Sequence, residues 1–161
     1  MPAELHEISL RGSTLRRGFW LYAWEVTTAN GDVVVYVGRT GDNSSPNAQS
    51  PFNRMGQHLG NSDASNTLRK HLIRRGIDPA ACDLRLVAYG PILDEAPDHD
   101  MDEHKIRRNV VGALEKRLAD ELTAAGYDVL NPVRCRWELD DALWADVLAV
   151  FAGEFPRLAA A

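Results

Sequence analysis

The sequence contains only two cysteines, and their spacing does not suggest a metal site. Cys82 and Cys135 are far apart in the chain, whereas zinc sites and redox motifs place cysteines within a few residues of each other. The chain also lacks an apolar run near the ~20 residues of a membrane span. Residues 1–10 lack the apolar segment of a signal peptide. These absences predict a cytoplasmic protein with free thiols and no membrane partner.

Positive charge is scarce for a protein that binds nucleic acid. The formal net charge is −5. Residues 1–90 carry 10 Lys and Arg against 8 Asp and Glu, and residues 91–161 carry 8 against 15. We therefore expect any binding to DNA to be weak and strongly salt-dependent, unless a partner or a second subunit adds positive surface.

The sequence shows no internal repeat and no linker that would divide the chain. Its 161 residues suit one domain with a sizeable core. We expect an arm over 1–18, a body over 19–132, and a helical extension over 133–161 packed on the same body. The arm holds three arginines, and a surface extension is favoured over an arm that contacts phosphate.

The strongest local pattern is a β-hairpin with a tight turn at Asn30-Gly31. Bulky side chains alternate before the turn, and a run of valines follows it. Each strand carries one tyrosine, Tyr22 and Tyr36, and Gly38 and Arg39 come soon after the second. Phenol hydroxyls beside a cation at the end of a strand indicate a functional site, because a pure core would favour Phe.

The length of the turn decides whether the two tyrosines share a face of the sheet. A two-residue loop would pair Ala29 with Asp32 and put the tyrosines on opposite faces. A three-residue loop, with Gly31 in the left-handed conformation, pairs Thr28 with Asp32 and puts both tyrosines on one face. If both serve one site, the longer loop is expected.

A helix is expected after a polar loop over 40–50. Ser50 suits its N-cap and Pro51 its first helical position. Arg54 and His58 lie four residues apart and therefore share one face of this helix. Its inward side chains are expected to be Phe52, Met55 and Leu59.

A second helix, expected over 63–75, is the most basic segment of the chain. Its cationic side chains form either a cluster that the helix dipole favours or a surface that follows phosphates. These cations are Arg69, Lys70, Arg74 and Arg75. Its inward side chains are expected to be Leu68, Leu72 and Ile73.

A third strand is expected over 82–89, bounded by Gly90-Pro91. The acidic stretch that follows contains His99 and His104. Neighbours this close in sequence mostly point apart, so a solvated helix N-terminus is favoured over a metal site.

Glu115 is the most informative residue of the long helix expected over 100–125. Apolar residues share its face of the helix, so its carboxylate stands within the inward stripe. A charged carboxylate in such a place needs a cation. That cation is either an arginine such as Arg54, in a structural ion pair, or a divalent metal. The apolar neighbours are Val111, Leu118 and Leu122.

The last part of the chain begins with a short extended piece over 127–130. Asn131 follows it, where a carboxamide can fix nearby backbone or catalytic side chains. The segment over 137–155 is amphipathic, and covering the core is favoured over docking a homodimer or a protein partner. The element order has few crossover units, so we expect an α+β fold: a small three-stranded antiparallel sheet flanked by helices.

These residues, in this order, resemble the signature of the GIY-YIG nuclease family. Trp20-Leu21-Tyr22, a gap, and Tyr36-Val37-Gly38 followed by a basic residue resemble the two short motifs of the family. The resemblance covers about 19–132. The first motif departs from the pattern of the family because it lacks the glycine. The family often has a further histidine or tyrosine in its middle region, and residues 61–63 of this sequence supply neither. The remaining hallmark types are present as Arg54, His58, Glu115 and Asn131.

The resemblance implies a metal-dependent endonuclease that hydrolyses phosphodiester bonds in DNA. Its implied catalytic residues are Tyr22, Tyr36, Arg54, His58 and Glu115. It favours a single Mg²⁺ or Mn²⁺ on Glu115 over a structural ion pair, and Arg54 would neutralise charge on the phosphoryl group. Tyr22 is the first choice to accept the proton of water, with its pKa lowered by Arg39, the metal or His58. His58 is alternatively the group that takes the proton of the tyrosine.

Other residues would support this chemistry. Gly38, Arg39 and Asn131 would shape the site, and the nucleic-acid contacts would be Arg39, Arg69, Lys70, Arg74 and Arg75. Two rival hypotheses stay open: a catalytically inactive module that binds nucleic acid or protein, and a structural subunit that acts through its C-terminal stripe.

Overall fold

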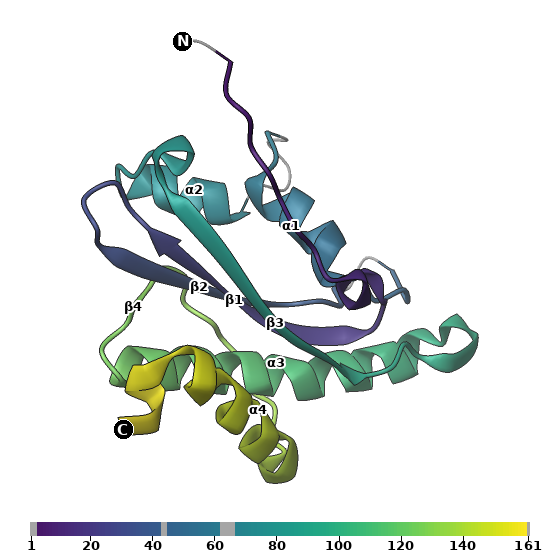
Figure 1. Cartoon of the computed structure of the whole chain (residues 1–161). Helices are drawn as coiled ribbons and strands as arrows, with labels where there is room; N and C mark the ends of the chain where they lie inside the picture. Colours follow the sequence, from purple (N-terminus) through teal and green to yellow (C-terminus); the bar gives the residue numbers. More distant parts are fainter. Residues whose placement is uncertain (1–2, 43–44, 62–66, 161) are drawn as a thin grey trace.

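The computed structural model describes residues 3–42, 45–61 and 67–160. Within these ranges a four-stranded sheet lies between two pairs of α-helices, and Figure 1 shows one pair on each face. The α+β class is therefore confirmed. Among the helices described, none combines the length and the apolar character needed to cross a membrane.

The strands lie in the order β3-β1-β2-β4 across the sheet. Their bounds are β1 (Phe19–Thr27), β2 (Val33–Arg39), β3 (Asp83–Leu93) and β4 (Asp128–Val129). The first three are antiparallel, but β4 runs parallel to β2. The expected three-stranded antiparallel sheet is thus corrected to a four-stranded mixed one. The piece after the long helix pairs with the outer edge of β2, where Leu130 N donates to Val35 O at 2.7 Å.

The turn between β1 and β2 has the expected three-residue loop. Thr28 N donates to Asp32 O at 2.8 Å, and Gly31 has a φ of 86°. Tyr22 consequently stands opposite Gly38, and Tyr36 stands opposite Trp24. Both tyrosines therefore lie on one face of the sheet, as predicted.

That face is covered by α1 (Pro51–Leu59) and α2 (Thr67–Arg74). Ser50 caps α1 through a bond from Asn53 N at 3.3 Å, as expected. Part of the expected second helix, residues 63–66, lies outside the described residues. Phe52 is 43% exposed and Ile73 is 55% exposed, so the prediction that they face inward is wrong. Each short helix buries only a narrow row of side chains, which is Pro51 and His58 in α1 and Leu68 and Leu72 in α2.

The opposite face is covered by α3 (Met101–Ala124) and α4 (Asp141–Glu154). Leu114, Leu118 and Leu122 of α3 are fully buried there. The apolar stripe of α4 packs into the same core. Its buried side chains are Trp144, Val147 and Phe151, together with Phe155 just after the helix. The prediction that this stripe covers the core is confirmed, and these four side chains are not exposed for docking.

Strand β3 continues past Gly90-Pro91, where the sequence predicted its end. The register against β1 shifts between Phe19 and Leu21, so this dipeptide falls in an irregular part of the ladder. Pro91 has no N–H to donate to a neighbouring strand, and it is tolerated there because β3 is an edge strand.

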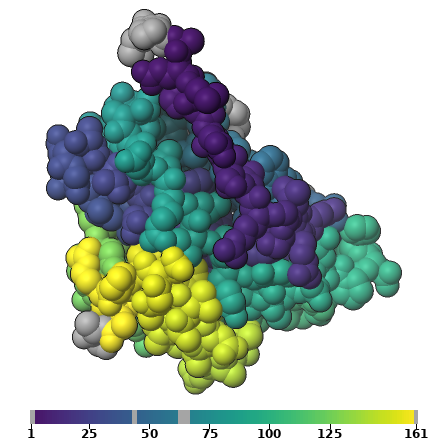
Figure 2. All heavy atoms as spheres, viewed as in Figure 1, coloured from purple at the N-terminus to yellow at the C-terminus, as the bar shows by residue number. Residues whose placement is uncertain are grey.

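The described part of the N-terminal arm is a surface extension, as expected. Figure 2 shows it running over the surface and projecting beyond the body. Arg17, near the end of the arm that joins the body, forms an ion pair with Glu95 at 2.9 Å. The acidic stretch forms an exposed helix N-terminus, as expected, with Asp100 as the N-cap of α3. His104 in the first turns of α3 is the exception, because it is completely buried. Its Nε2 lies 2.8 Å from the backbone oxygen of Asp42.

Candidate functional site

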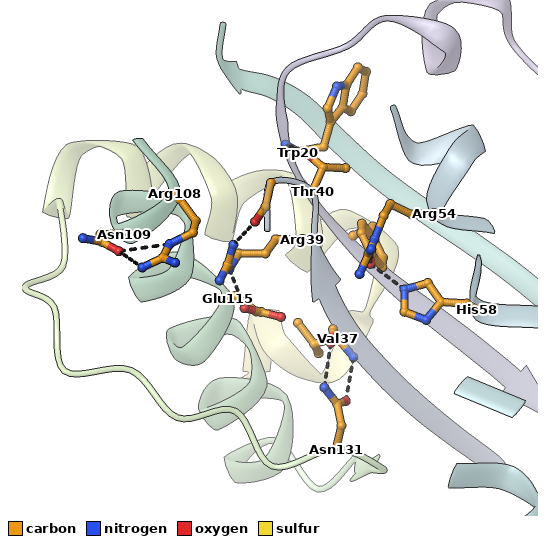
Figure 3. Close-up of polar contacts among 12 residues, drawn as sticks. Trp20, Val37, Arg39, Thr40, Arg54, His58, Arg108, Asn109, Glu115 and Asn131 are labelled. Carbon is orange, nitrogen blue, oxygen red and sulfur yellow. Dashed lines mark hydrogen bonds and ion pairs between the residues drawn. The ribbon is translucent and has the colours of Figure 1, made fainter. Parts of the chain in front are cut away.

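A cavity of about 220 Å³ lies where β2 ends, between α1 and α3. Figure 3 shows that Arg54 and His58 approach from the side of α1, while Arg39 and Glu115 lie on the side of α3. Elements from both faces of the sheet therefore contribute to one site. The residues that line the cavity are Tyr22, Tyr36, Gly38, Arg39, Gly41, Asp42, Arg54, Arg108 and Glu115.

Gly38 makes room for Tyr22 in this cavity. The two residues are direct partners across β1 and β2, so their side chains would occupy the same face. A Cβ atom at position 38 would lie 2.6 Å from three atoms of the Tyr22 ring, including its hydroxyl oxygen. The glycine after Val37 is thus required by the tyrosine that lies above it.

We expect Gly38→Ala to destabilise the fold by about 1–3 kcal/mol, because the fully packed Tyr22 ring must move. Gly56→Ala is the matched control, since Gly56 is exposed within α1 and an added Cβ would meet nothing within 4 Å. That change should be neutral or stabilising by up to ~1 kcal/mol. Urea unfolding of both variants checks the pair, and an unchanged midpoint for Gly38→Ala would contradict the steric explanation.

Tyr22 is bonded to a buried histidine. Its hydroxyl oxygen lies 2.6 Å from His58 Nε2, and His58 is only 1% exposed. The ring of Tyr36 contacts the same imidazole edge-on, with centroids 5.0 Å apart. Within the described residues His58 Nδ1 has no hydrogen-bond partner. The two tyrosines and the histidine therefore form one tightly packed group.

The electrostatics of this group differ from the expectation that cations would lower the pKa of Tyr22. Burial raises the pKa of Tyr22 to about 12, although Arg54 acts in the opposite direction. Burial also raises the pKa of Tyr36. The pKa of His58 falls to about 4 through burial and the nearby charge of Arg54. Near pH 7 the hydrogen bond consequently joins a neutral phenol and a neutral imidazole.

The buried imidazole makes fold stability depend on pH. His58 binds a proton below about pH 4 in the folded chain but near its ordinary pKa of 6.5 in the unfolded chain. The unfolded state thus binds more protons between these values, so stability falls as pH drops through this window, by about 3 kcal/mol in total. In His58→Gln this contribution to the loss of stability at low pH should disappear. Unfolding at pH 7.5 and pH 4 measures it, with His6→Gln in the exposed arm as a control that should behave like the wild type.

Arg54 contributes its guanidinium to the wall of the cavity. Its Nε lies 3.5 Å from the Tyr22 hydroxyl, which is a long contact. Its Nη1 donates to Gln57 Oε1 at 2.5 Å, and Gln57 in turn donates to Gln49 at 3.1 Å. This chain of contacts orients the guanidinium while the cavity side remains open to a ligand.

Glu115 does form an ion pair, but with Arg39 rather than with Arg54. Arg39 Nε donates to Glu115 Oε2 at 2.9 Å, and the two side chains are 24% and 17% exposed. Burial raises the pKa of Glu115, and Arg39 opposes that rise. Arg39 also donates to the backbone oxygen of Gly41. The structural ion pair, which the resemblance made the less favoured alternative, is thus present, and the carboxylate also lines the cavity.

Asn131 has a positioning role in the strand that carries the site. Its carboxamide accepts from Val37 N at 3.0 Å and donates to Val37 O at 2.7 Å. These bonds continue the pairing of β2 after β4 has ended at Val129, as Figure 3 shows. The expectation that this carboxamide fixes nearby backbone is confirmed, and Asn131 does not line the cavity.

The four cations expected on α2 lie outside the cavity. Arg75 makes two bonds to Asp128, at 2.8 and 2.9 Å, beside the turn end of the hairpin. Their contact with nucleic acid stays a prediction. In the region where a further histidine or tyrosine was sought, Asn61 is exposed, and Ser62 and Asp63 lie outside the described residues.

Three residues of the site were not anticipated from the sequence. Asp42 and Arg108 line the cavity, and Thr40 fixes the start of the segment that follows β2 and leads to Asp42. Thr40 Oγ1 accepts from Trp20 N at 2.8 Å and donates to Gly18 O at 2.6 Å. The sequence signal for Thr40 and Asp42 was their place shortly after Arg39. The signal for Arg108 was its position seven residues before Glu115, which puts both side chains on one face of α3.

The charges in the cavity suit a phosphate together with a cation. Glu115 has a carboxylate that could hold a divalent ion, and Asp42 lines the same space. Three guanidinium groups outnumber these two carboxylates: Arg39, Arg54 and Arg108. No group of three or more His, Cys, Asp or Glu that could hold a metal occurs among the described residues. Mg²⁺ needs fewer, because it commonly binds through one or two carboxylates and the substrate phosphate.

Comparisons of the chain with protein-family models, with curated proteins and with solved structures gave no match.

Proposed function

We propose that this chain is a metal-dependent endonuclease that hydrolyses phosphodiester bonds in DNA. One observation carries the proposal: Tyr22, Tyr36, Arg54 and Glu115, from four elements and both sides of the sheet, line a single cavity of about 220 Å³. Packing alone does not require two phenols, a guanidinium and a carboxylate at one concave place. The resemblance to GIY-YIG nucleases, which rests on the same residues, supports the same conclusion.

The arginines of the cavity would bind the scissile phosphate. Arg54 is held by Gln57 on one side and faces the cavity on the other, so its position is set before a ligand arrives. A guanidinium in a partly buried site stabilises the charge that builds on a transferring phosphoryl group. Arg39 and Arg108 line the same cavity and would share that charge.

Glu115 would hold the divalent ion. When bound, Mg²⁺ or Mn²⁺ polarises the scissile phosphate and stabilises the leaving 3′ oxygen. Arg39 occupies Oε2 of Glu115 and leaves Oε1 for another cation, while its charge opposes the rise that burial gives to the pKa of the carboxyl group. This ion pair and metal ligation are therefore compatible.

Tyr22 and His58 would move the proton of the attacking water. The water oxygen bonds to phosphorus while its proton passes to the Tyr22 oxygen and the Tyr22 proton passes to His58 Nε2, 2.6 Å away. The bond to the 3′ oxygen breaks, and solvent supplies the proton of that oxygen. His58, whose pKa is lowered to about 4, then returns its proton to Tyr22 or to solvent. No free phenolate forms, which matters because burial raises the pKa of Tyr22 to about 12. Tyr36, whose ring contacts His58, would position the imidazole.

A catalytically inactive binding module is the second candidate. The observation that favours it is the ion pair between Arg39 and Glu115 at 2.9 Å, because a carboxylate with an arginine partner has a structural role without any metal.

Incubation of the purified chain with duplex, flap, branched and single-stranded DNA, with and without Mg²⁺ or Mn²⁺, separates the two candidates. The nuclease is expected to cut at least one of these substrates, only with the divalent ion, and to leave 5′-phosphate and 3′-hydroxyl ends. Binding without cleavage of every substrate would support the inactive module instead.

A further inference from the structure

A second cavity of about 240 Å³ adjoins the proposed active site. The two cavities share Arg39, Arg108 and Glu115 in their walls. The segment between β4 and α4, which follows Asn131, forms the outer wall with Arg134, Arg136 and Trp137. Figure 3 shows this segment passing α3 on the side of Arg108 and Asn109. The two cavities therefore lie side by side, with three side chains between them.

The second cavity, called the groove from here on, is more positively charged than the part of the chain around it. Residues 91–161 contain 8 cations and 15 acidic residues, and most of these cations have nearby partners. Four form ion pairs within α3: Lys105, Arg107, Lys116 and Arg117. Arg157 donates to Gly126 O at 2.7 Å and lies over the Tyr127 ring.

The remaining three cations, Arg108, Arg134 and Arg136, all line the groove. In the described ranges none of them has a carboxylate within 4.0 Å. Arg134 and Arg136 are both exposed. In an acidic half of the chain, the unpaired positive charge is thus confined to the groove beside the cavity.

Trp137 adds an aromatic surface to these charges. It is 45% exposed, whereas Trp20, Trp24 and Trp144 are 4%, 3% and 8% exposed. The guanidinium of Arg136 lies over its ring, 4.8 Å from the centroid. An exposed aromatic ring next to guanidinium groups is the arrangement that holds single-stranded nucleic acid, since bases stack on the ring and phosphates contact the cations.

We propose that this groove binds a single-stranded DNA segment next to the scissile phosphate, with one base stacked on Trp137. The inference deepens the proposed nuclease function and rests on it for the meaning of the first cavity. It assigns the substrate class: DNA with unpaired nucleotides beside the cut, as in a flap, a gap or a free end. Phosphates of that segment would contact Arg134 and Arg136, while the scissile phosphate would lie at Arg39 and Arg54.

Tryptophan fluorescence tests the stacking directly, because Trp137 is the exposed tryptophan of the chain. A short oligonucleotide of about six thymidines is titrated into the protein in EDTA, so that binding is measured without cleavage. Emission is expected to fall on binding in the wild type and to stay constant in Trp137→Phe, which keeps a ring for stacking and should bind almost as tightly. Trp137→Ala is expected to weaken binding about tenfold, measured with a labelled strand.

A matched pair of charge variants tests the contribution of the groove. Arg134→Gln/Arg136→Gln should weaken binding of this strand about tenfold and reduce its salt dependence. Arg11→Gln/Arg16→Gln in the exposed arm removes the same charge outside both cavities and should have a smaller effect. Equal losses in the two double variants, or wild-type affinity in Trp137→Ala, would overturn the proposal.

The binding assay also separates this inference from the nuclease proposal. Strand binding that depends on Trp137, in a chain that cuts no DNA, would retain the groove and reject the nuclease. Cleavage by a chain whose strand affinity does not change in Trp137→Ala would retain the nuclease and reject the groove.

Discussion

Glu115→Gln is expected to lower the rate of DNA cleavage by at least about 10³-fold while leaving DNA binding intact. The amide keeps the shape of the side chain and an oxygen that accepts from Arg39, but it removes the charge that would hold the divalent ion. Loss of a metal that stabilises a leaving oxygen removes several kcal/mol of transition-state stabilisation, which corresponds to a change of about this size. The pocket also becomes more positive, so affinity for DNA should be equal or higher.

The same variant distinguishes catalysis from the structural ion pair with Arg39. If Glu115 serves only that ion pair, its replacement changes the free energy of unfolding and leaves the rate of cleavage alone. Glu121→Gln is the matched control, since Glu121 lies on the same helix in an ion pair with Arg117 at 2.7 Å and does not line the cavity. It should cut DNA like the wild type.

Tyr22→Phe is expected to reduce the cleavage rate by about 10²–10⁴-fold, the usual range for loss of a group that transfers a proton. The phenyl ring still fills the space over Gly38, so the site keeps its shape and its arginines. The bond of 2.6 Å to His58 is lost, and neither nitrogen of the imidazole then has a partner among the residues that the structure describes. A decrease in stability of about 1–2 kcal/mol should accompany the kinetic effect.

Cleavage rates under saturating DNA, together with DNA affinity and urea unfolding, measure both effects of Tyr22→Phe. Tyr127→Phe is the control, because its hydroxyl accepts from Arg157 N at 3.3 Å far from the cavity. A Tyr22→Phe enzyme that cuts at the wild-type rate would remove Tyr22 from the proton transfer and would leave Tyr36 as the remaining phenol in the cavity.

The hairpin was predictable because its pairing follows from parity. Side chains alternate between faces, so the requirement that Tyr22 and Tyr36 share one face implied a three-residue loop, and this loop is present. The cap of α1 was equally local, since Ser50 and Pro51 act through backbone geometry that a few residues determine. The short strand β4 was underestimated, because a two-residue strand carries no alternation and depends on the free edge of β2.

The prediction that distant residues converge on one cavity rested on their order in the sequence more than on any local pattern. The sequence offered a divalent metal or an arginine such as Arg54 as the cation next to Glu115, whereas Arg39 occupies that place. Parity puts Arg39 on the face opposite the tyrosines, but only the packing of α3 on that face decides which guanidinium reaches the carboxylate. The pKa of Tyr22 was expected to fall. Its depth of burial, which raises that pKa, is a property of the packed chain rather than of the sequence around it.

Nicking of supercoiled plasmid DNA tests the proposed chemistry most directly. Wild-type protein, Glu115→Gln and Glu121→Gln are compared in Mg²⁺, in Mn²⁺ and in EDTA. The nuclease proposal expects relaxed or linear DNA with 5′-phosphate ends from the wild type and Glu121→Gln in either metal, and intact plasmid from Glu115→Gln and from every protein in EDTA. Equal nicking by the wild type and Glu115→Gln, or plasmid left intact by all three proteins, would contradict it.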